Sequence, residues 1–403
     1  MKRYPVARTR AFEAPEAYGR WRAAAPATRV VLPSGVTAWL VTRYDDVRRL
    51  LRHPALVSDS THPGYPRFGA AVEVPPLNRT FIGLDGPAHR RLRQMFAGEF
   101  SVPAVSGFEP RLTAIVDACL DGMSGDDGIS GDDGISGDPV DLVAGFALPV
   151  ASRVICDVLG LGYAEHERFE DATHVLTDAA STDAAKAAAG AAIVELVAAL
   201  VRERRRQPRD DLASRIVTRH VATGELTEPA AVHNLALVLG AGHHTSANML
   251  ALSVAVLLRE PAWADRFRAE PELRGNAVEE LLRYLTIVQL GLGRVATADI
   301  PVGDVVVRAG DGVVLSVLTA NRDARRFPDP DRLDLARPDA RHHVAFGFGP
   351  HQCVGHWLAR RTIHIALARL FTRLPGLRLA AGHDLHFTEA TDFHGLRQLP
   401  VSW

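Results

Sequence analysis

The chain has 403 residues, of which 47% are hydrophobic and 23% are charged, and its formal net charge is −1. This composition excludes a disordered chain, a collagen-like fibre and a coiled coil. The balanced charge also excludes a sequence-neutral binder of nucleic acids, because such a protein needs a strong basic excess. A chain of this length buries roughly three quarters of its unfolded surface, so its core needs no disulfide or metal.

The cysteines and the N-terminus indicate the compartment. Three cysteines are present, Cys119, Cys156 and Cys353, and none forms a CxxC pair, which excludes a zinc ribbon and a thioredoxin-type motif. A sparse and odd number of cysteines is typical of a reducing compartment. Residues 1–5 lead into a charged stretch without an apolar segment, so we expect no signal peptide and no N-terminal anchor. The sequence therefore predicts a cytoplasmic protein.

The N-terminal part of the chain combines short helices with a β-hairpin. Two apolar stretches, 29–32 and 36–41, flank a Pro-Ser-Gly turn and predict the hairpin. Residues 54–86 are rich in proline, glycine, serine and asparagine, and a loop of this length in a compact protein is usually functional. Apolar spacing predicts helices at 14–25, 45–53, 87–96 and 111–120.

An acidic repeat interrupts this pattern, since residues 125–130 and 131–136 both read GDDGIS. The repeat lacks the spacing and the closing glutamate of an EF-hand loop. We therefore interpret residues 123–138 as an exposed acidic loop that was expanded by duplication.

Helical patterns dominate the remainder of the chain. The alanine-rich segment 183–206 predicts a long helix whose basic end suits the helix dipole. Segment 235–258 is the most apolar and is long enough to span a bilayer. Polar residues in its middle favour instead a helix buried in a soluble protein. We also expect helices at 277–285 and 354–374, strands at 305–307 and 313–317, and irregular structure at 327–341.

The segment FGFGPHQCVG, residues 346–355, carries the strongest chemical signal. Its glycines let the backbone turn tightly, and Cys353 lies at the start of a predicted helix, where free N–H groups favour a thiolate. A thiolate presented from one side suits a haem iron, whose four equatorial positions are already filled. Taken alone, Cys353 is more simply a buried structural cysteine.

The whole string resembles the haem-thiolate signature FGxGxHxCxG of the cytochrome P-450 family. This resemblance implies haem b with Cys353 as its axial ligand, and with Phe346 and Gly347 against the cofactor. It extends from about residue 44 to the C-terminal Leu399-Pro400, and it is to soluble bacterial members. The implied fold is mainly α with small β-sheets, as a single large domain over residues 1–403.

A second motif of the family lies on a predicted helix. Glu280 and Arg283 match its ExxR pattern, and residues three apart on a helix face each other. A surface ion pair is the plain alternative. In the family this pair joins a later arginine, here Arg337, and the resemblance implies that the three lock the loop that carries Cys353. The aromatic residue usual near that arginine is Leu333 here.

The segment DGPAHRRLR, residues 85–93, resembles the family motif DxPxHxxxR. Haem carries two propionates, which need cationic or hydrogen-bonding partners when they are buried. Any single candidate would pass for an ordinary surface charge. By resemblance, the residues that bind the propionates are His89, Arg93, Arg294 and His351.

The central apolar helix carries AGHHT where the family has AGxET or AGxDT. By resemblance, Ala241 and Gly242 make room for dioxygen and Thr245 holds water there. His244 replaces the usual acid, which puts the usual proton route in doubt. His244 either relays protons, since imidazole titrates near neutral pH, or bonds a neighbouring carbonyl while water delivers them. A third hypothesis, in which His244 blocks the iron, fits the helix geometry least.

The resemblance implies a monooxygenase that hydroxylates or epoxidises an apolar small molecule in bacterial natural-product tailoring. One alternative is oxidative coupling or ring closure without oxygen insertion, and another is a non-catalytic haem-binding sensor. By resemblance the substrate pocket is lined by the 54–86 loop and by five apolar residues, for each of which core packing is the alternative: Val238, Ile287, Val288, Leu290 and Phe393.

The chain shows no flavin or iron–sulfur segment, so electrons have to come from a partner. A ferredoxin and its reductase are the expected donors. Four arginines near the predicted cysteine loop are candidates for a surface that docks an acidic partner, although solvated arginines are the alternative: Arg90, Arg91, Arg360 and Arg361.

Overall fold

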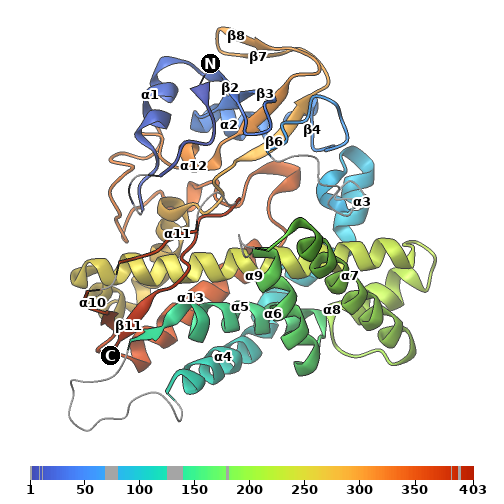
Figure 1. Cartoon of the computed structure of the whole chain (residues 1–403), viewed down its shortest axis with the longest axis vertical. Helices are drawn as coiled ribbons and strands as arrows, with labels where there is room; N and C mark the ends of the chain where they lie inside the picture. Colours follow the sequence, from blue (N-terminus) through green and yellow to red (C-terminus); the bar gives the residue numbers. More distant parts are fainter. Residues whose placement is uncertain are drawn as a thin grey trace.

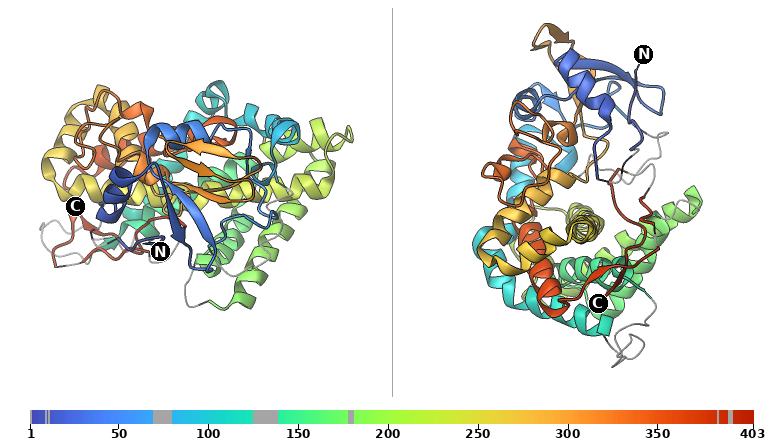
Figure 2. Two further views of the ribbon diagram at one scale, coloured as in Figure 1. Left: turned by 90° about the horizontal axis from the view of Figure 1, so that it is seen from above. Right: turned by 90° about the vertical axis from the view of Figure 1, so that its left-hand side faces the viewer.

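The computed structural model describes residues 2–8, 10, 12–68, 80–124, 139–177, 181–382, 384–388 and 392–403. The GDDGIS repeat lies outside these residues, so the acidic loop at 123–138 stays a prediction. A body of long helices carries a smaller β-rich part at one end, and helix α9 (Glu228–Arg259) runs through the middle of the body (Figure 1). Seen end-on, α9 is surrounded by other parts of the chain (Figure 2, right).

The helical body agrees closely with the sequence predictions. Its further helices are α3 (Gly86–Ala97), α4 (Val102–Ser124), α5 (Leu148–Leu159), α6 (Tyr163–Thr177), α7 (Asp183–Arg206), α8 (Leu212–Ile216), α10 (Pro261–Ala269), α11 (Arg274–Leu285) and α13 (His356–Arg373). Short helices are α1 (Glu16–Ala24), α2 (Tyr44–Leu50) and α12 (Val317–Ala320). The predicted helix at 111–120 was too short, because α4 accommodates Pro110 in its interior instead of beginning after it.

The β-rich part contains a mixed sheet in the order β1-β2-β3-β9-β6-β4. Its strands are β1 (Lys2–Arg3), β2 (Ala27–Val31), β3 (Thr37–Val41), β9 (Gly312–Leu315), β6 (Leu292–Ala296) and β4 (Leu56–Val57). Strands β2 and β3 pair antiparallel, which confirms the predicted hairpin. The prediction of a strand at 313–317 was wrong at its end, where α12 begins. Two small sheets contain β10 (Arg378–Leu379), β11 (Pro400–Ser402) and β5 (Val140–Asp141), and β7 (Ile300–Val302) with β8 (Val305–Val307).

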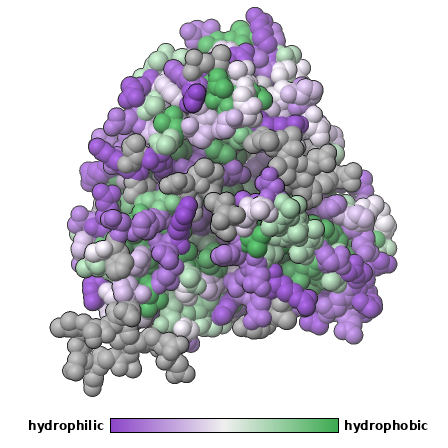
Figure 3. Space-filling model, viewed as in Figure 1, coloured by the Kyte–Doolittle hydropathy of each residue, from purple (hydrophilic) through white to green (hydrophobic). Residues whose placement is uncertain are grey.

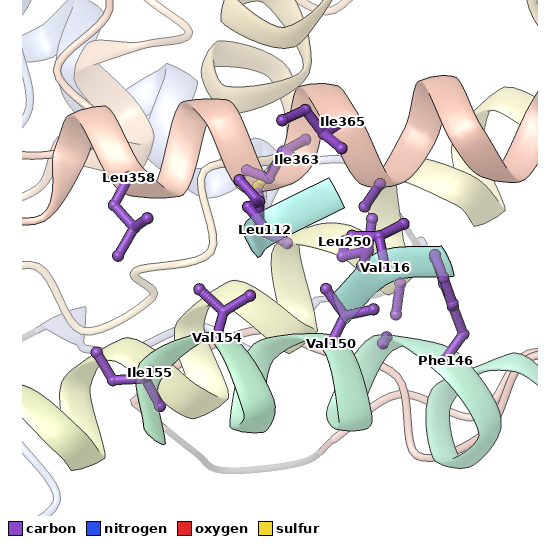
Figure 4. Close-up of a cluster of buried hydrophobic side chains, with 14 of the residues drawn as sticks. Leu112, Val116, Phe146, Val150, Val154, Ile155, Leu250, Leu358, Ile363 and Ile365 are labelled. Atoms are coloured by element: carbon purple, nitrogen blue, oxygen red, sulfur yellow. The ribbon is translucent and has the colours of Figure 1, made fainter. Parts of the chain in front are cut away.

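The largest hydrophobic cluster fills the space between α9 and the helices around it. Figure 4 shows side chains of α4, α5, α9 and α13 meeting there, among them Val116, Val150, Leu250 and Ile363. Because α9 contributes buried residues along most of its length, it is the axis of the core. This confirms the prediction of a central buried helix.

Helix α7 is the one helix in the described part of the chain that is long and apolar enough to cross a membrane. This property concerns length and composition only, and α7 packs against α6 and α9. Over the face drawn in Figure 3, hydrophilic residues are interspersed with hydrophobic ones. We therefore assign α7 to the helical body.

Candidate functional site

Cys353 lies in a tight loop between a 3-10 turn, Gly349–His351, and helix α13. The loop turns at Gly347 and Gly349, whose φ angles of 71° and 78° favour glycine over other residues. A side chain at position 349 would also collide with Arg52, whose Cγ would lie 2.6 Å from the new Cβ. The Cys353 N–H donates to the Phe346 carbonyl over 2.9 Å, and this bond closes the loop.

Opposing effects act on the ionisation of the Cys353 thiol. Cys353 is exposed, although desolvation by the neighbouring protein atoms raises the pKa of its thiol. The Gly355 N–H and the guanidinium groups of Arg93 and Arg360 act in the opposite direction and favour the thiolate. An exposed cysteine whose thiolate is favoured by a nearby N–H donor and two guanidinium groups can ligate a metal centre.

The Glu280 carboxylate joins two arginines in the interior. Arg283 donates from Nε and Nη2 to its two oxygens over 2.7 and 2.8 Å, and Arg337 donates from Nε over 3.0 Å. All three side chains are buried. The other guanidinium N–H groups donate to the carbonyls of Asn321, Pro328, Asp329, Pro330 and Arg332. The ExxR pair is therefore part of a buried triad and not a surface ion pair.

Asn321 connects this triad to the cysteine loop. Its carbonyl accepts from Arg283 Nη1 over 2.8 Å, and its side-chain Oδ1 accepts from the Val344 N–H, also over 2.8 Å. The Val344 carbonyl in turn accepts from the N–H of Gly347, where the loop begins to turn. The triad is thus linked to the loop through Asn321.

A second carboxylate, Glu279, was missed by the sequence analysis. It accepts from Arg360 Nε over 2.6 Å and lies 3.1 Å from His343 Nε2. Burial of Glu279 opposes its ionisation, but the bonds from His343 and Arg360 outweigh burial and lower its pKa to about 2. Since His343 precedes the Cys353 loop and Arg360 follows it, Glu279 holds both ends of the loop.

The predicted propionate-binding residues come together. The rings of His89 and His351 stack with their centroids 4.1 Å apart, and an Arg93 Nη2 group donates to the Gln352 carbonyl. Burial and the charges of His351, Arg93 and Arg294 lower the pKa of His89 to about 4. Residues from α3, β6 and the cysteine loop therefore form one cluster of imidazole and guanidinium groups.

This cluster fits a ligand that carries carboxylates. Its own carboxylate, Asp85, lies 3.0 Å from His351 Nε2. Arg294 is buried and donates from Nη1 to the neighbouring Gly293 carbonyl over 2.6 Å. The Nε2 atom of His89 is buried, and no residue in the described ranges offers it a hydrogen-bond partner. Carboxylates such as the propionates of haem would supply the acceptors that these groups need.

Two adjacent small residues of α9, Ala241 and Gly242, differ in their surroundings. The Thr245 hydroxyl donates to the Ala241 carbonyl over 2.6 Å, and Ala241 is exposed. Gly242 faces α5, where an added Cβ would lie 2.7 Å from Ile155 Cδ1. Close packing of the two helices therefore accounts for the glycine. The roles of these residues at an oxygen site stay predictions.

Two adjacent histidines of α9 contact each other. The rings of His243 and His244 meet edge to face with centroids 4.5 Å apart. His243 is buried against Phe169 of α6, whereas His244 is half-buried and its pKa is lowered by burial. His244 is therefore held as a mainly neutral imidazole beside Thr245.

Of the five predicted pocket residues, one is buried and four are half-buried. Val288 and Phe393 pair in an isolated antiparallel bridge, which brings segment 287–290 to the C-terminal turn. Val238 is buried in the largest hydrophobic cluster, which agrees with core packing. Of the 54–86 loop, residues 69–79 lie outside the described part of the chain. Half-buried positions are Ile287, Val288, Leu290 and Phe393.

The interpretation of Arg360 as a docking residue is wrong. Its side chain is only 17% exposed, pairs with Glu279 and stacks over the Phe346 ring at 4.6 Å. Arg90 and Arg91 are exposed and Arg361 is partly exposed, so these three stay candidates. Sequence alone could not separate them, because Glu279 lies far from Arg360 along the chain.

The sequence profile of the cytochrome P450 family matches residues 30–375. The chain is 43% identical over 380 residues to Cytochrome P450-SU2 of Streptomyces griseolus, a match that covers 94% of this chain and 91% of that protein. It is 40% identical over 401 residues to mycinamicin VIII C21 methyl hydroxylase of Micromonospora griseorubida, covering 99% of each.

Solved structures agree with this relationship. The crystal structure of mycinamicin VIII C21 methyl hydroxylase bound to mycinamicin VIII matches with a TM-score of 0.90 at 39% identity, over all of both chains. The structure of GfsF, a cytochrome P450 of Streptomyces halstedii, matches with a TM-score of 0.92 at 36% identity, again over both full chains. Members of this family hold haem through a cysteine thiolate. The chain belongs to the cytochrome P450 family and is a monooxygenase of the oxidoreductase class.

Proposed function

We propose that this chain binds haem b through the Cys353 thiolate and inserts one oxygen atom from dioxygen into an apolar small molecule. The observation that supports this proposal is that Cys353 is exposed in a loop that Glu279 and the Glu280 triad stabilise. Haem supplies dioxygen activation when it is bound, and a thiolate ligand favours O–O cleavage.

The residues around the sulfur have complementary tasks. His89, Arg93, Arg294 and His351 would bind the propionates of haem, and Phe346 and Gly347 would contact the porphyrin. Thr245 holds water at the oxygen-binding side of α9. His244 accepts a proton at one ring nitrogen and releases one at the other, in place of the usual acid.

The relatives support a role in bacterial secondary metabolism. They include mycinamicin VIII C21 methyl hydroxylase and pentalenic acid synthase of Streptomyces avermitilis, each 40% identical to this chain. The half-buried apolar residues Ile287, Val288, Leu290 and Phe393 suit an apolar substrate. We propose that the protein works in the cytoplasm, with a ferredoxin and a ferredoxin reductase as electron donors.

The axial ligand is tested with the variant Cys353→His. We expect it to retain some haem but to lose the red-shifted absorbance band of the thiolate-ligated ferrous carbonyl form. Cys119→Ala, which changes a buried cysteine in α4, is the control and should keep the band. A band that survives in Cys353→His would show that another residue ligates the iron.

The reaction type is tested with isotopically labelled dioxygen. A spectral screen of apolar compounds against the ferric protein first identifies a ligand. We expect the product of that ligand to gain one labelled oxygen atom. A product that loses hydrogen without gaining label would indicate coupling or ring closure instead.

A further inference from the structure

Helices α6 and α9 enclose a row of imidazoles. His166 on α6 and His243 on α9 are both buried, and His243 contacts the ring of His244. Both ring nitrogens of His243 are buried without a hydrogen-bond partner among the residues that the structure describes. Buried polar groups are almost always hydrogen-bonded, so an imidazole with two open nitrogens in the interior indicates a function.

The row continues to the surface through α6. The His166 Nε2 atom lies 3.4 Å from the Glu170 Oε1 atom, and the Glu170 side chain is 36% exposed. Phe169, three residues after His166 on α6, contacts the His243 ring with centroids 5.0 Å apart. The charges of both His166 and His244 act on His243, so both rings lie near it. A carboxylate open to solvent is therefore followed by three imidazoles, the last of which lies beside Thr245.

Burial is the main cause that lowers the pKa of His243 to about 3, with smaller effects from His244 and His166. A neutral imidazole has one nitrogen that accepts a proton and one that donates. Other charged groups near the row are Arg153 of α5 and Glu167 of α6, both of which act on His166. Since no residue in the described ranges is hydrogen-bonded to either ring nitrogen of His243, no partner fixes its tautomer and its unprotonated nitrogen is open to receive a proton.

We propose that Glu170, His166 and His243 form a proton path from the surface of α6 to His244. This inference rests on the proposed function, in which His244 delivers protons beside Thr245. When a proton binds one ring nitrogen of His243, a new N–H bond forms there and the N–H bond at the other nitrogen breaks. The ring is neutral before and after, and no electron is transferred. Water molecules bridge gaps that exceed a hydrogen bond.

The variants His243→Phe and Glu170→Gln test the path in the haem-loaded enzyme. Phenylalanine keeps the ring contact with Phe169 but has no nitrogen, and Glu170 is at the accessible end of the path. We expect each variant to bind haem and substrate normally and to divert reducing equivalents several-fold more to hydrogen peroxide. Because both residues act in one series, the double variant should be no worse than His243→Phe alone. His233→Phe, on the same helix, is the control.

A second measurement reports on the path without turnover. In the diamagnetic ferrous carbonyl form with ¹⁵N-labelled histidine, we expect exchange of the His243 ring proton with solvent to slow several-fold in Glu170→Gln. Unchanged exchange, or parental coupling in His243→Phe, would overturn the path. If His243→Phe does not fold, peroxide formation and ring-proton exchange in Glu170→Gln test the path. Loss of the thiolate band in the parent would instead refute the proposed function, so the two failures are distinguishable.

Discussion

The two sides of the candidate haem site are stabilised in opposite ways. On the α11 side, Glu279 and Glu280 are hydrogen-bonded to buried arginines and to a histidine. On the α9 side, His243 is just as deeply buried, but its ring nitrogens have no hydrogen-bond partner in the described part of the chain. Polar side chains in the interior are therefore hydrogen-bonded on the α11 side, whereas the His243 imidazole on the α9 side has no such partner in the described residues.

This difference matches two different physical tasks. A loop that presents a metal ligand must not move, and a fully satisfied buried network is rigid. A group that transfers protons must exchange hydrogen-bond partners during the transfer. Ring nitrogens without a fixed hydrogen-bond partner are therefore better suited to this task. We infer that α11 holds the ligand in position and that α9 and α6 supply protons.

The largest expected effect is on the α11 side. Glu280→Ala leaves the guanidinium groups of Arg283 and Arg337 buried without their carboxylate. Removal of one partner of a buried ion pair lowers the free energy of unfolding by about 3–5 kcal/mol. We expect little folded, haem-loaded protein, measured by urea unfolding and by absorbance. Glu272→Ala, an exposed glutamate just before α11, should change stability by less than about 0.5 kcal/mol. Comparable stability of the two variants would mean that the triad does not hold the loop.

Glu279 offers a test that depends on pH. Its folded pKa of about 2 lies below the ordinary value of 4.5, so its contribution is fully present above about pH 4.5 and is lost as pH falls toward 2. A shift of this size corresponds to at most about 3 kcal/mol. We expect Glu279→Gln to be less stable than the parent near neutral pH, and the gap in unfolding free energy to narrow on acidification. A gap that is constant with pH would contradict the ionised state.

A smaller effect is expected where α9 packs on α5. Gly242→Ala places a methyl group against Ile155, and overpacking of this kind costs about 1–3 kcal/mol. Gly240→Ala on the same helix meets open space and should be neutral or stabilising by up to about 1 kcal/mol. Thermal unfolding of both variants measures the difference. Ile155→Val should relieve part of the Gly242→Ala defect, and equal effects of the two alanines would show that the helices are not in close contact.

Much of the fold could be predicted because its signals are local. The alanine-rich composition of 183–206 predicts α7 at the observed residues, and the apolar composition of 235–258 predicts that α9 lies in the core. The extent of α4 could not be predicted, since a proline in a helix interior usually ends the helix. Pro110 nevertheless lies inside α4, where tertiary packing stabilises the helix. The strand prediction at 313–317 failed for a similar reason, because the chain enters α12 at Val317.

The sequence by itself determined the Cys353 loop and its ExxR partner helix, since the spacing of glycines, cysteine and charged residues within short segments dictates local geometry. Only the tertiary structure decided which distant groups meet. It joined Glu279 to His343 and Arg360, turned Gly242 toward Ile155, and buried His243 without a bonded partner in the described residues. Contacts of this kind depend on how helices pack, and packing couples residues that no fixed spacing along the chain relates.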